Sequence, residues 1–184
     1  MSGIITDNVG RSSGLVKSAG GGGTILSVKS MKFTTTASET GTVPTQLSNF
    51  DMSFAPTTSD GKLYFQAYLS VGGSSDNGTA FYFYDVTNTT IIGAYADAAG
   101  SRLRTSFTML IDGSSYTNTV AFGCWHEPGT TSSRDYTIFG NANQATTLYI
   151  NRNGTYTDNT KIDYANKAST FTIFEYAAST VTLT

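Results

Sequence analysis

The lone cysteine and the lone histidine are the pair of residues best able to do chemistry. Cys124 and His126 are two positions apart, and in a β-strand residues at that spacing point to the same face. A thiol beside an imidazole base could act as a nucleophile. Their Cβ atoms would, however, lie about 6.5–7 Å apart along an extended strand, and no third group orients the imidazole. We therefore expect a buried cysteine beside a histidine at a strand end, without a catalytic role.

Two glycine-containing segments invite comparison with phosphate-binding loops. The segment Gly14-Leu-Val-Lys17-Ser18 lacks the Walker spacing, because two residues separate the glycine from the lysine and no strand precedes it. The run from Gly20 to Gly23 precedes a strand and not a helix, so the dinucleotide-binding pattern fails as well. Neither segment predicts a nucleotide cofactor.

An oxygen-rich stretch covers residues 151–163. It contains Asp158 and Asp163, whereas a calcium loop needs closely spaced carboxylates, a glycine at a set place and a terminal glutamate. The default interpretation is a long polar loop with Asx turns, and a metal site is the alternative. A glycosidase needs a pair of acidic residues at a cleft, and no such pair stands out. We predict no enzyme activity, no metal and no cofactor.

Trp125 precedes the polar loop 127–134. Together with His126, this loop could form a patch that binds a sugar or a protein surface. Trp125 could equally be a core residue, and the sequence leaves both interpretations open.

Composition narrows the classes of partner. Of the 184 residues, 13% are charged, and the net charge is −2. Binding to nucleic acid depends on concentrated lysine and arginine, so we expect no nucleic-acid partner. No apolar run approaches the roughly 18 residues that span a membrane, and the N-terminus does not resemble a signal peptide. We expect a chain that folds in the cytoplasm and does not enter a membrane.

Alternating apolar and polar residues predict β-strands from residue 24 onward. Turn signals separate these segments, and no segment of helical length has a 3.6-residue apolar period. The pattern favours an all-β, antiparallel sandwich or jelly roll. The predicted strands are 24–35, 47–55, 62–71, 79–86, 90–96, 101–111, 118–126, 135–140, 146–151 and 168–176.

Several predicted strands carry aromatic rings on both faces. A sandwich strand usually presents a polar second face to water, but here that face repeatedly carries rings. Tyrosines at sheet edges with hydroxyls in water are one explanation. The other is a second face buried against another subunit, for which tyrosine is well suited because its body is apolar and its tip forms hydrogen bonds. We predict a homo-oligomer whose interface includes Tyr64, Tyr68, Tyr82, Tyr84, Phe174 and Tyr176.

The segment before the first strand predicts an arm. Residues 1–23 have no sustained periodicity, and the four consecutive glycines can adopt almost any backbone angle. We expect an N-terminal attachment arm over residues 1–23 and a head domain over residues 24–184. The expected anchoring residues are Ile4, Ile5, Val9, Arg11, Leu15, Val16 and Lys17, and the expected hinge is Gly20, Gly21, Gly22 and Gly23.

Five stretches spread along the chain resemble a family of small virion proteins of tailed bacteriophages, abundant among marine and cyanobacterial phages. The resemblance covers nearly the whole chain in order, and each stretch is only moderately specific. The closing segment is similar to the last strand of a trimeric jelly roll of the tumour-necrosis-factor type. The stretches are MSGIITDNVGRSSGLVKS, ILSVKSMKFTTT, AAGSRLRTSF, TTLYINRNGTYTDN and ASTFTIFEYAAS.

The resemblance implies a structural role. It implies a homotrimer that decorates the capsid or forms a short head fibre on the virion, assembled in the host cytoplasm. Its partners would be further copies of itself and another virion protein, with the major capsid protein as the first candidate. A tail-fibre tip that binds a host receptor or surface glycan, through loops such as 72–78, 127–134 and 152–166, is the alternative. The absence of a long repetitive or coiled-coil region favours the decoration role.

Overall fold

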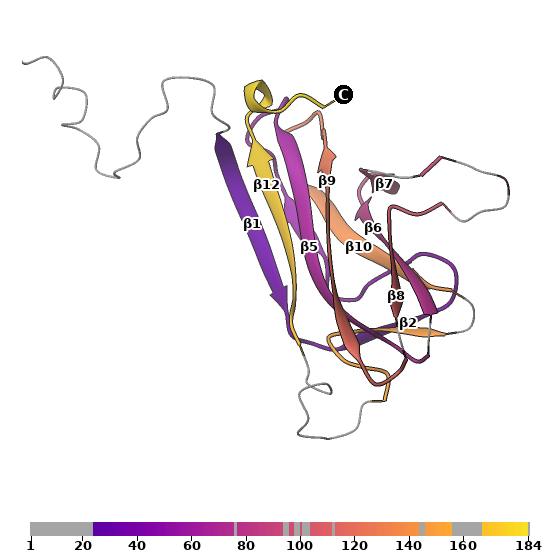
Figure 1. The fold of residues 1–184 in the computed structure, drawn as a ribbon. Helices are drawn as coiled ribbons and strands as arrows, with labels where there is room; N and C mark the ends of the chain where they lie inside the picture. Colours follow the sequence, from indigo (N-terminus) through magenta and orange to yellow (C-terminus); the bar gives the residue numbers. More distant parts are fainter. Residues whose placement is uncertain are drawn as a thin grey trace, which may run out of the picture.

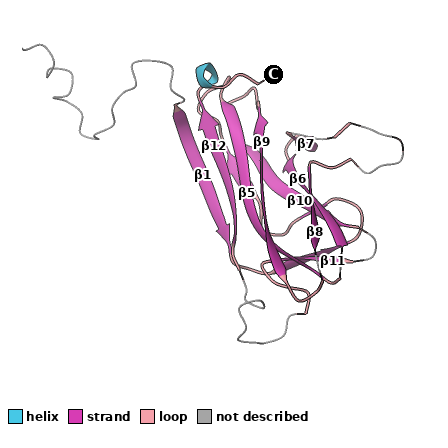
Figure 2. Ribbon diagram, viewed as in Figure 1, coloured by secondary structure: helices cyan, strands magenta, loops and turns pink. Residues whose placement is uncertain are grey.

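The structure, a computed structural model, describes residues 24–75, 77–93, 96–97, 100, 104–111, 113–143, 146–155 and 167–183. The described residues form two antiparallel β-sheets that pack face to face (Figures 1 and 2). A short 3-10 helix, η2 (Ala178–Thr180), follows the last strand. The predicted all-β sandwich is therefore confirmed.

The first sheet has six strands around the long strand β5 (Lys62–Gly73). One edge of β5 pairs along its length with β9 (Thr117–His126). Its other edge pairs first with β12 (Ser169–Tyr176) and then with β11 (Thr147–Ile150). The outermost strands are β1 (Ile25–Phe33), which pairs with β12, and β2 (Ala37–Thr40), which pairs with β11.

The second sheet also has six strands, around β6 (Asn77–Asp85) and β10 (Arg134–Ala142). The outer edge of β10 pairs with the short strands β3 (Thr45–Gln46) and β4 (Met52–Phe54). The outer edge of β6 pairs with β7 (Thr90–Ile92) and β8 (Phe107–Ile111).

The strand order is that of a jelly roll. The last strand, β12, lies between β1 and β5, and β10 lies between β4 and β6. The chain therefore crosses repeatedly between the sheets, as in two Greek keys. This topology places strands from both ends of the chain side by side, so the sandwich closes only when the C-terminal strand is in place.

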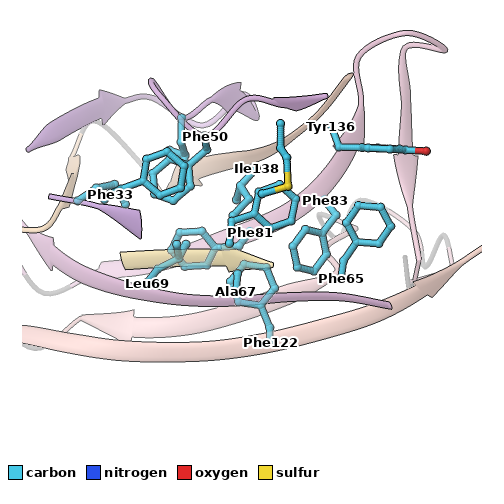
Figure 3. Close-up of a cluster of buried hydrophobic side chains, with 14 of the residues drawn as sticks. Phe33, Phe50, Phe65, Ala67, Leu69, Phe81, Phe83, Phe122, Tyr136 and Ile138 are labelled. Atoms are coloured by element: carbon cyan, nitrogen blue, oxygen red, sulfur yellow. The ribbon is translucent and has the colours of Figure 1, made fainter. Parts of the chain in front are cut away.

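The core consists of the inward-facing residues of both sheets (Figure 3). Phe65 on β5 lies at its centre, with its ring centroid 5.5 Å from that of Phe83 and 5.0 Å from that of Tyr136. Phe33 and Phe50 stack at a centroid distance of 3.9 Å. Full burial of one such ring is worth roughly 1.5–3 kcal/mol, so this aromatic core accounts for much of the stability of the head domain.

The predicted strand boundaries differ from the structure in three places. The expected strand 47–55 is reduced to β4, because Asn49 has φ 69° and the Phe50 amide bonds the Leu47 carbonyl in a turn. The expected strands 90–96 and 101–111 shorten to β7 and β8. Strands β2 and β3 were not predicted, because polar residues on such short segments give no alternating apolar signal.

Candidate functional site

The outward-facing side of the first sheet carries a continuous row of apolar side chains. Val28 on β1 pairs with Phe174 on β12, Phe174 pairs with Tyr64 on β5, and Tyr64 pairs with Trp125 on β9. Directly paired residues of antiparallel strands lie on the same face. Their sequence neighbours Leu63, Phe65 and Ile173 point inward and are fully buried, so the row faces away from the core.

The rings of this row contact one another. The Tyr64 centroid lies 4.9 Å from that of Trp125 and 6.5 Å from that of Phe174. Trp125 and Tyr176 are 5.2 Å apart at a steep angle of 62°. Rings at these separations attract each other beyond their burial. We call Val28, Tyr64, Tyr68, Trp125, Phe174 and Tyr176 the outer aromatic face.

Much of this face is open within one chain. Val28 is 53% exposed and Tyr68 46% exposed, and the neighbouring Ile25 of β1 is 47% exposed. Exposed apolar patches on protein domains often serve as interaction surfaces, so this face is the candidate site.

The centre of the face carries no charge. The row beside the aromatic row consists of Ser30, Thr172, Gln66 and Gly123. Ser30 and Thr172 share a hydrogen bond of 2.8 Å between their hydroxyl groups. Charged residues lie at the two ends of the face: Lys62, in the row of Tyr176, forms an ion pair with Glu127, and the exposed Lys32 of β1 lies in the row of Thr170 and Tyr68. A second copy could therefore meet the centre of this face without like-charge repulsion.

Gly123 fixes the position of the Tyr64 ring. A Cβ atom at this position would lie only 2.4 Å from the Tyr64 hydroxyl oxygen and 2.7 Å from the Phe65 carbonyl oxygen. The Tyr64 side chain therefore lies against the bare backbone of β9. A larger residue at position 123 would displace the Tyr64 ring from this place.

The structure places two of the predicted interface residues on the other sheet, and full burial within the chain contradicts the prediction for one of them, Tyr82. Tyr82 and Tyr84 lie on β6, which the jelly-roll topology places in the second sheet. Tyr82 is fully buried within its own chain, and its hydroxyl donates to the Arg104 carbonyl oxygen at 3.3 Å. Tyr84 stacks on Phe139 with centroids 4.1 Å apart. Neither belongs to the outer aromatic face, because the outer sides of the two sheets point in opposite directions.

Val28 and Trp125 are the members of this face that the interface prediction missed. The interpretation of Trp125 as a core residue is wrong, because Trp125 packs against Tyr64 and Tyr176 on the outer side of the sheet. The alternation of side chains along a strand could have revealed this position. Cys124 is apolar and buried, so Trp125, the next residue of the strand, must point outward.

Cys124 and His126 point toward the core from β9. The Cys124 thiol donates weakly to the Ile92 carbonyl oxygen at 3.8 Å, and burial raises its pKa to about 12. Burial also lowers the pKa of His126, against the opposing effect of the Asp85 charge. A thiol that stays protonated at neutral pH is a poor nucleophile. The expected burial of Cys124 is confirmed.

Asn151, the first residue of the oxygen-rich stretch, uses its side chain in hydrogen bonds within the chain. The Asn151 amide nitrogen donates to the carbonyl oxygens of Phe33 and Thr35, and its Oδ1 accepts from the Ser169 hydroxyl at 2.6 Å. Asp158 and Asp163 lie outside the described residues. Within the described part of the chain, no three His, Cys, Asp or Glu residues lie close enough to hold a metal ion.

The expected anchoring residues and the glycine hinge, residues 1–23, also lie outside the described residues. The attachment arm therefore stays a prediction. Among the helices that the structure describes, none combines the length and the apolar character that crossing a membrane requires.

Comparison with known proteins identifies no family for this chain. No protein-family model matches the chain, and no curated protein matches it. Among solved structures, the chain is similar to the crystal structure of the infectious bursal disease virus VP2 subviral particle, with 14% sequence identity and a TM-score of 0.34. The match covers 81% of this chain but 36% of that one, so this chain spans about a third of the viral protein. A similarity this low says nothing about what the chain does.

Proposed function

We propose that this chain is a non-enzymatic structural protein of a tailed-phage virion, which works as a homotrimer. Three copies would pack with their outer aromatic faces toward one another. In this proposal the trimer decorates or cements the capsid, or forms a short head fibre, and residues 1–23 anchor it. The resemblance of the chain to small phage virion proteins suggests the setting, and the trimer follows from the same resemblance.

The observation that carries the proposal is the outer aromatic face. Tyr64, Trp125, Phe174 and Tyr176 form one layer of contacting rings on the side of the sheet away from the core. Tyrosine, tryptophan and phenylalanine are enriched in protein interfaces, and charged residues are depleted at interface centres. Burial of each ring is worth roughly 1.5–3 kcal/mol at most, so several rings per subunit would support a permanent assembly.

A second copy of the chain is the occupant that this face fits best. The centre of the face is neutral, so identical faces meet without repulsion, and the exposed Ile25 and Leu26 extend the apolar surface along β1. A charged partner would find no complementary charge at the centre. The Lys62–Glu127 ion pair lies at the upper end, where an interface is usually polar.

The substitution Val28→Glu should separate the subunits. Val28 is 53% exposed, so a carboxylate there leaves the core intact, but assembly would bury that charge without a partner. Val43→Glu is the matched control, because Val43 is 73% exposed on the loop between β2 and β3. We expect trimers for the wild type and Val43→Glu, and mainly monomers for Val28→Glu, by light scattering at micromolar concentration.

A monomeric wild-type protein at micromolar concentration would overturn the trimer. A trimeric Val28→Glu variant would show that the subunits meet through another surface. Far-ultraviolet circular dichroism of both variants checks that the fold is retained, so a loss of assembly is not mistaken for unfolding.

A further inference from the structure

The outer side of the second sheet contains a hollow at one end of β6. Tyr84, Tyr82, Ala80 and Gly78 alternate along β6 and therefore share this side. From Tyr84 toward Gly78, the side chains on this side of β6 become smaller: two tyrosine rings are followed by the methyl group of Ala80 and then by a glycine without a side chain. This step in size leaves a cavity of about 470 Å³ over Ala80 and Gly78, within the range of about 300–1,000 Å³ that is usual for small-molecule sites.

Gly78 keeps the hollow open, and the fold gives no reason for a glycine there. Among the described residues, the nearest neighbours of a Cβ atom at Gly78 would be Leu110, at 3.9 Å, and Asn143, at 4.0 Å, and the φ of Gly78 is not in the left-handed region. Glycine inside a strand weakens the strand and often marks a place where a ligand approaches the backbone closely. Any larger residue would project into the cavity.

Asn141 supplies a second and independent sign of a ligand. Asn141 pairs with Ala80 across the sheet and is only 3% exposed. Its amide nitrogen donates to the Thr42 carbonyl oxygen at 3.0 Å, which fixes the orientation of the carboxamide. Its Oδ1 has no hydrogen-bond partner among the described residues. Buried polar atoms of this kind normally have a partner. Oδ1 is itself closed to water, so an O–H donor of a ligand would reach it only after a small movement of the Asn141 side chain or its neighbours.

The walls of the hollow are neutral and of mixed polarity. Thr108 pairs with Ala80 and Leu110 pairs with Gly78, so a hydroxyl group and an isobutyl group face the hollow, whereas Met109 between them packs against the core. The described residues that line the hollow include no charged side chain. A ligand that suits these walls is uncharged, donates and accepts several hydrogen bonds, and also has an apolar face.

We propose that this hollow binds a neutral saccharide. A pyranose ring combines hydroxyl groups at its edge with C–H groups on its faces, and so matches the threonine and asparagine side chains beside Ala80 and Leu110. The lining lacks an aromatic ring, so affinity for one sugar unit should be weak, in the millimolar range. The sites of a trimer would add avidity toward a glycan-covered surface, and this last point alone rests on the proposed function.

The test fills the hollow without straining the chain. Gly78→Phe places a ring in the cavity at a position where a Cβ atom meets no close contact. Thr90→Phe is the matched control, because Thr90 is an exposed residue of the neighbouring strand β7 and does not line the hollow. Backbone amide shifts of the full chain are followed by NMR during titration with methyl hexopyranosides of glucose, galactose and mannose, with N-acetylglucosamine, and with glucuronate.

We expect at least one neutral sugar to shift the amides of Gly78, Leu110 and Asn143 with a saturating curve. Gly78→Phe should weaken that binding at least tenfold, and Thr90→Phe should not change it. Glucuronate should bind more weakly than the neutral sugars, because the hollow offers no cation. If no neutral sugar shifts these amides, or if the same shifts persist in Gly78→Phe, the proposal is wrong. Each subunit is observed directly, so this outcome is independent of the oligomeric state.

Discussion

The carboxylate of Glu175 is fully buried at the end of the sandwich where β12 ends. It accepts hydrogen bonds from the Ser27 hydroxyl, from the Thr57 amide and hydroxyl, and from the Thr58 amide, at 2.7 to 3.1 Å. Burial alone would raise the pKa of Glu175, but the bonds from Thr57, Ser27 and Thr58 outweigh it and hold the pKa below its usual value. Glu175 thus joins β12 to β1 and to the turn before β5.

Replacing Glu175 with glutamine should destabilise the protein at neutral pH by about 2 to 3 kcal/mol, because the charged acceptor of several hydrogen bonds is lost. A lowered carboxyl pKa contributes stability that is present above the usual value near 4.5 and is lost as the pH falls through the folded-state pKa. Urea unfolding at fixed protein concentration should therefore show a shallower acid decline in Glu175→Gln than in the wild type.

Glu39 serves as a control because its pKa is shifted in the opposite direction from that of Glu175. Burial raises the pKa of Glu39, so its ionisation opposes folding as the pH rises through the usual value. Glu39→Gln should leave stability at neutral pH unchanged or slightly higher. If Glu175→Gln behaved in the same way as Glu39→Gln, the hydrogen bonds at Glu175 would not be stabilising its charged form.

At the scale of elements, the sheet around β5 has two different apolar faces. Its inner face packs on the second sheet through Phe65 and Phe171, whose ring centroids lie 5.5 Å and 5.7 Å from that of Phe83 on β6. Its outer face presents Tyr64, Trp125 and Phe174. A sheet with one solvated side would alternate apolar and polar residues, so the rings on both faces of β5 and β12 are the feature of these strands that calls for a partner.

Trp125 should report assembly by its fluorescence. It is the only tryptophan in the sequence and lies on the outer aromatic face. In a trimer built through this face the indole would be shielded from water, whereas in a monomer it would be partly hydrated. We expect Val28→Glu to shift the emission to longer wavelength and to increase quenching by acrylamide, relative to Val43→Glu and the wild type.

The same emission spectrum and quenching in Val28→Glu and Val43→Glu, with Val28→Glu shown to be monomeric, would place Trp125 outside the interface. The subunits would then meet mainly through the β1 side of the sheet, where Ile25 and Leu26 are exposed.

At the scale of the whole molecule, the predicted division into arm and head makes assembly and attachment separable. The head forms a complete sandwich from residue 24 onward. Deletion of residues 2–23 should therefore leave a folded trimer with unchanged thermal unfolding, because residues that follow this segment form both sheets and the core between them. Attachment to the virion should be lost.

Purified particles complemented with the full-length or the shortened protein provide the measurement, by immunoblotting after sedimentation. Variants with Ile4, Ile5 and Val9 changed to serine, compared with serine changes of Thr6 and Asn8, test whether the apolar residues of the arm make the contact. Shortened protein on particles at the wild-type level would show that the head itself carries the attachment site.

The amino-acid sequence by itself determined the β class, most strand positions and the presence of rings on both faces of β5 and β12. These features are local, since alternation along one strand decides which residues share a face. Cys124 could be expected to be buried, and the Glu175 position alternates with outward-facing Phe174 and Tyr176 in the same way.

Only the tertiary structure decided which strands are neighbours, because jelly-roll pairing joins residues far apart in the sequence. That is why Tyr82 and Tyr84 were grouped with Tyr64 although β6 lies in the opposite sheet, and why Trp125 was missed. The same topology brings Gly78 of β6, Leu110 of β8 and Asn141 of β10 around one hollow. Alternation fixes the face of each residue within its strand, but sheet order fixes the partners of that face, and only long-range packing sets that order.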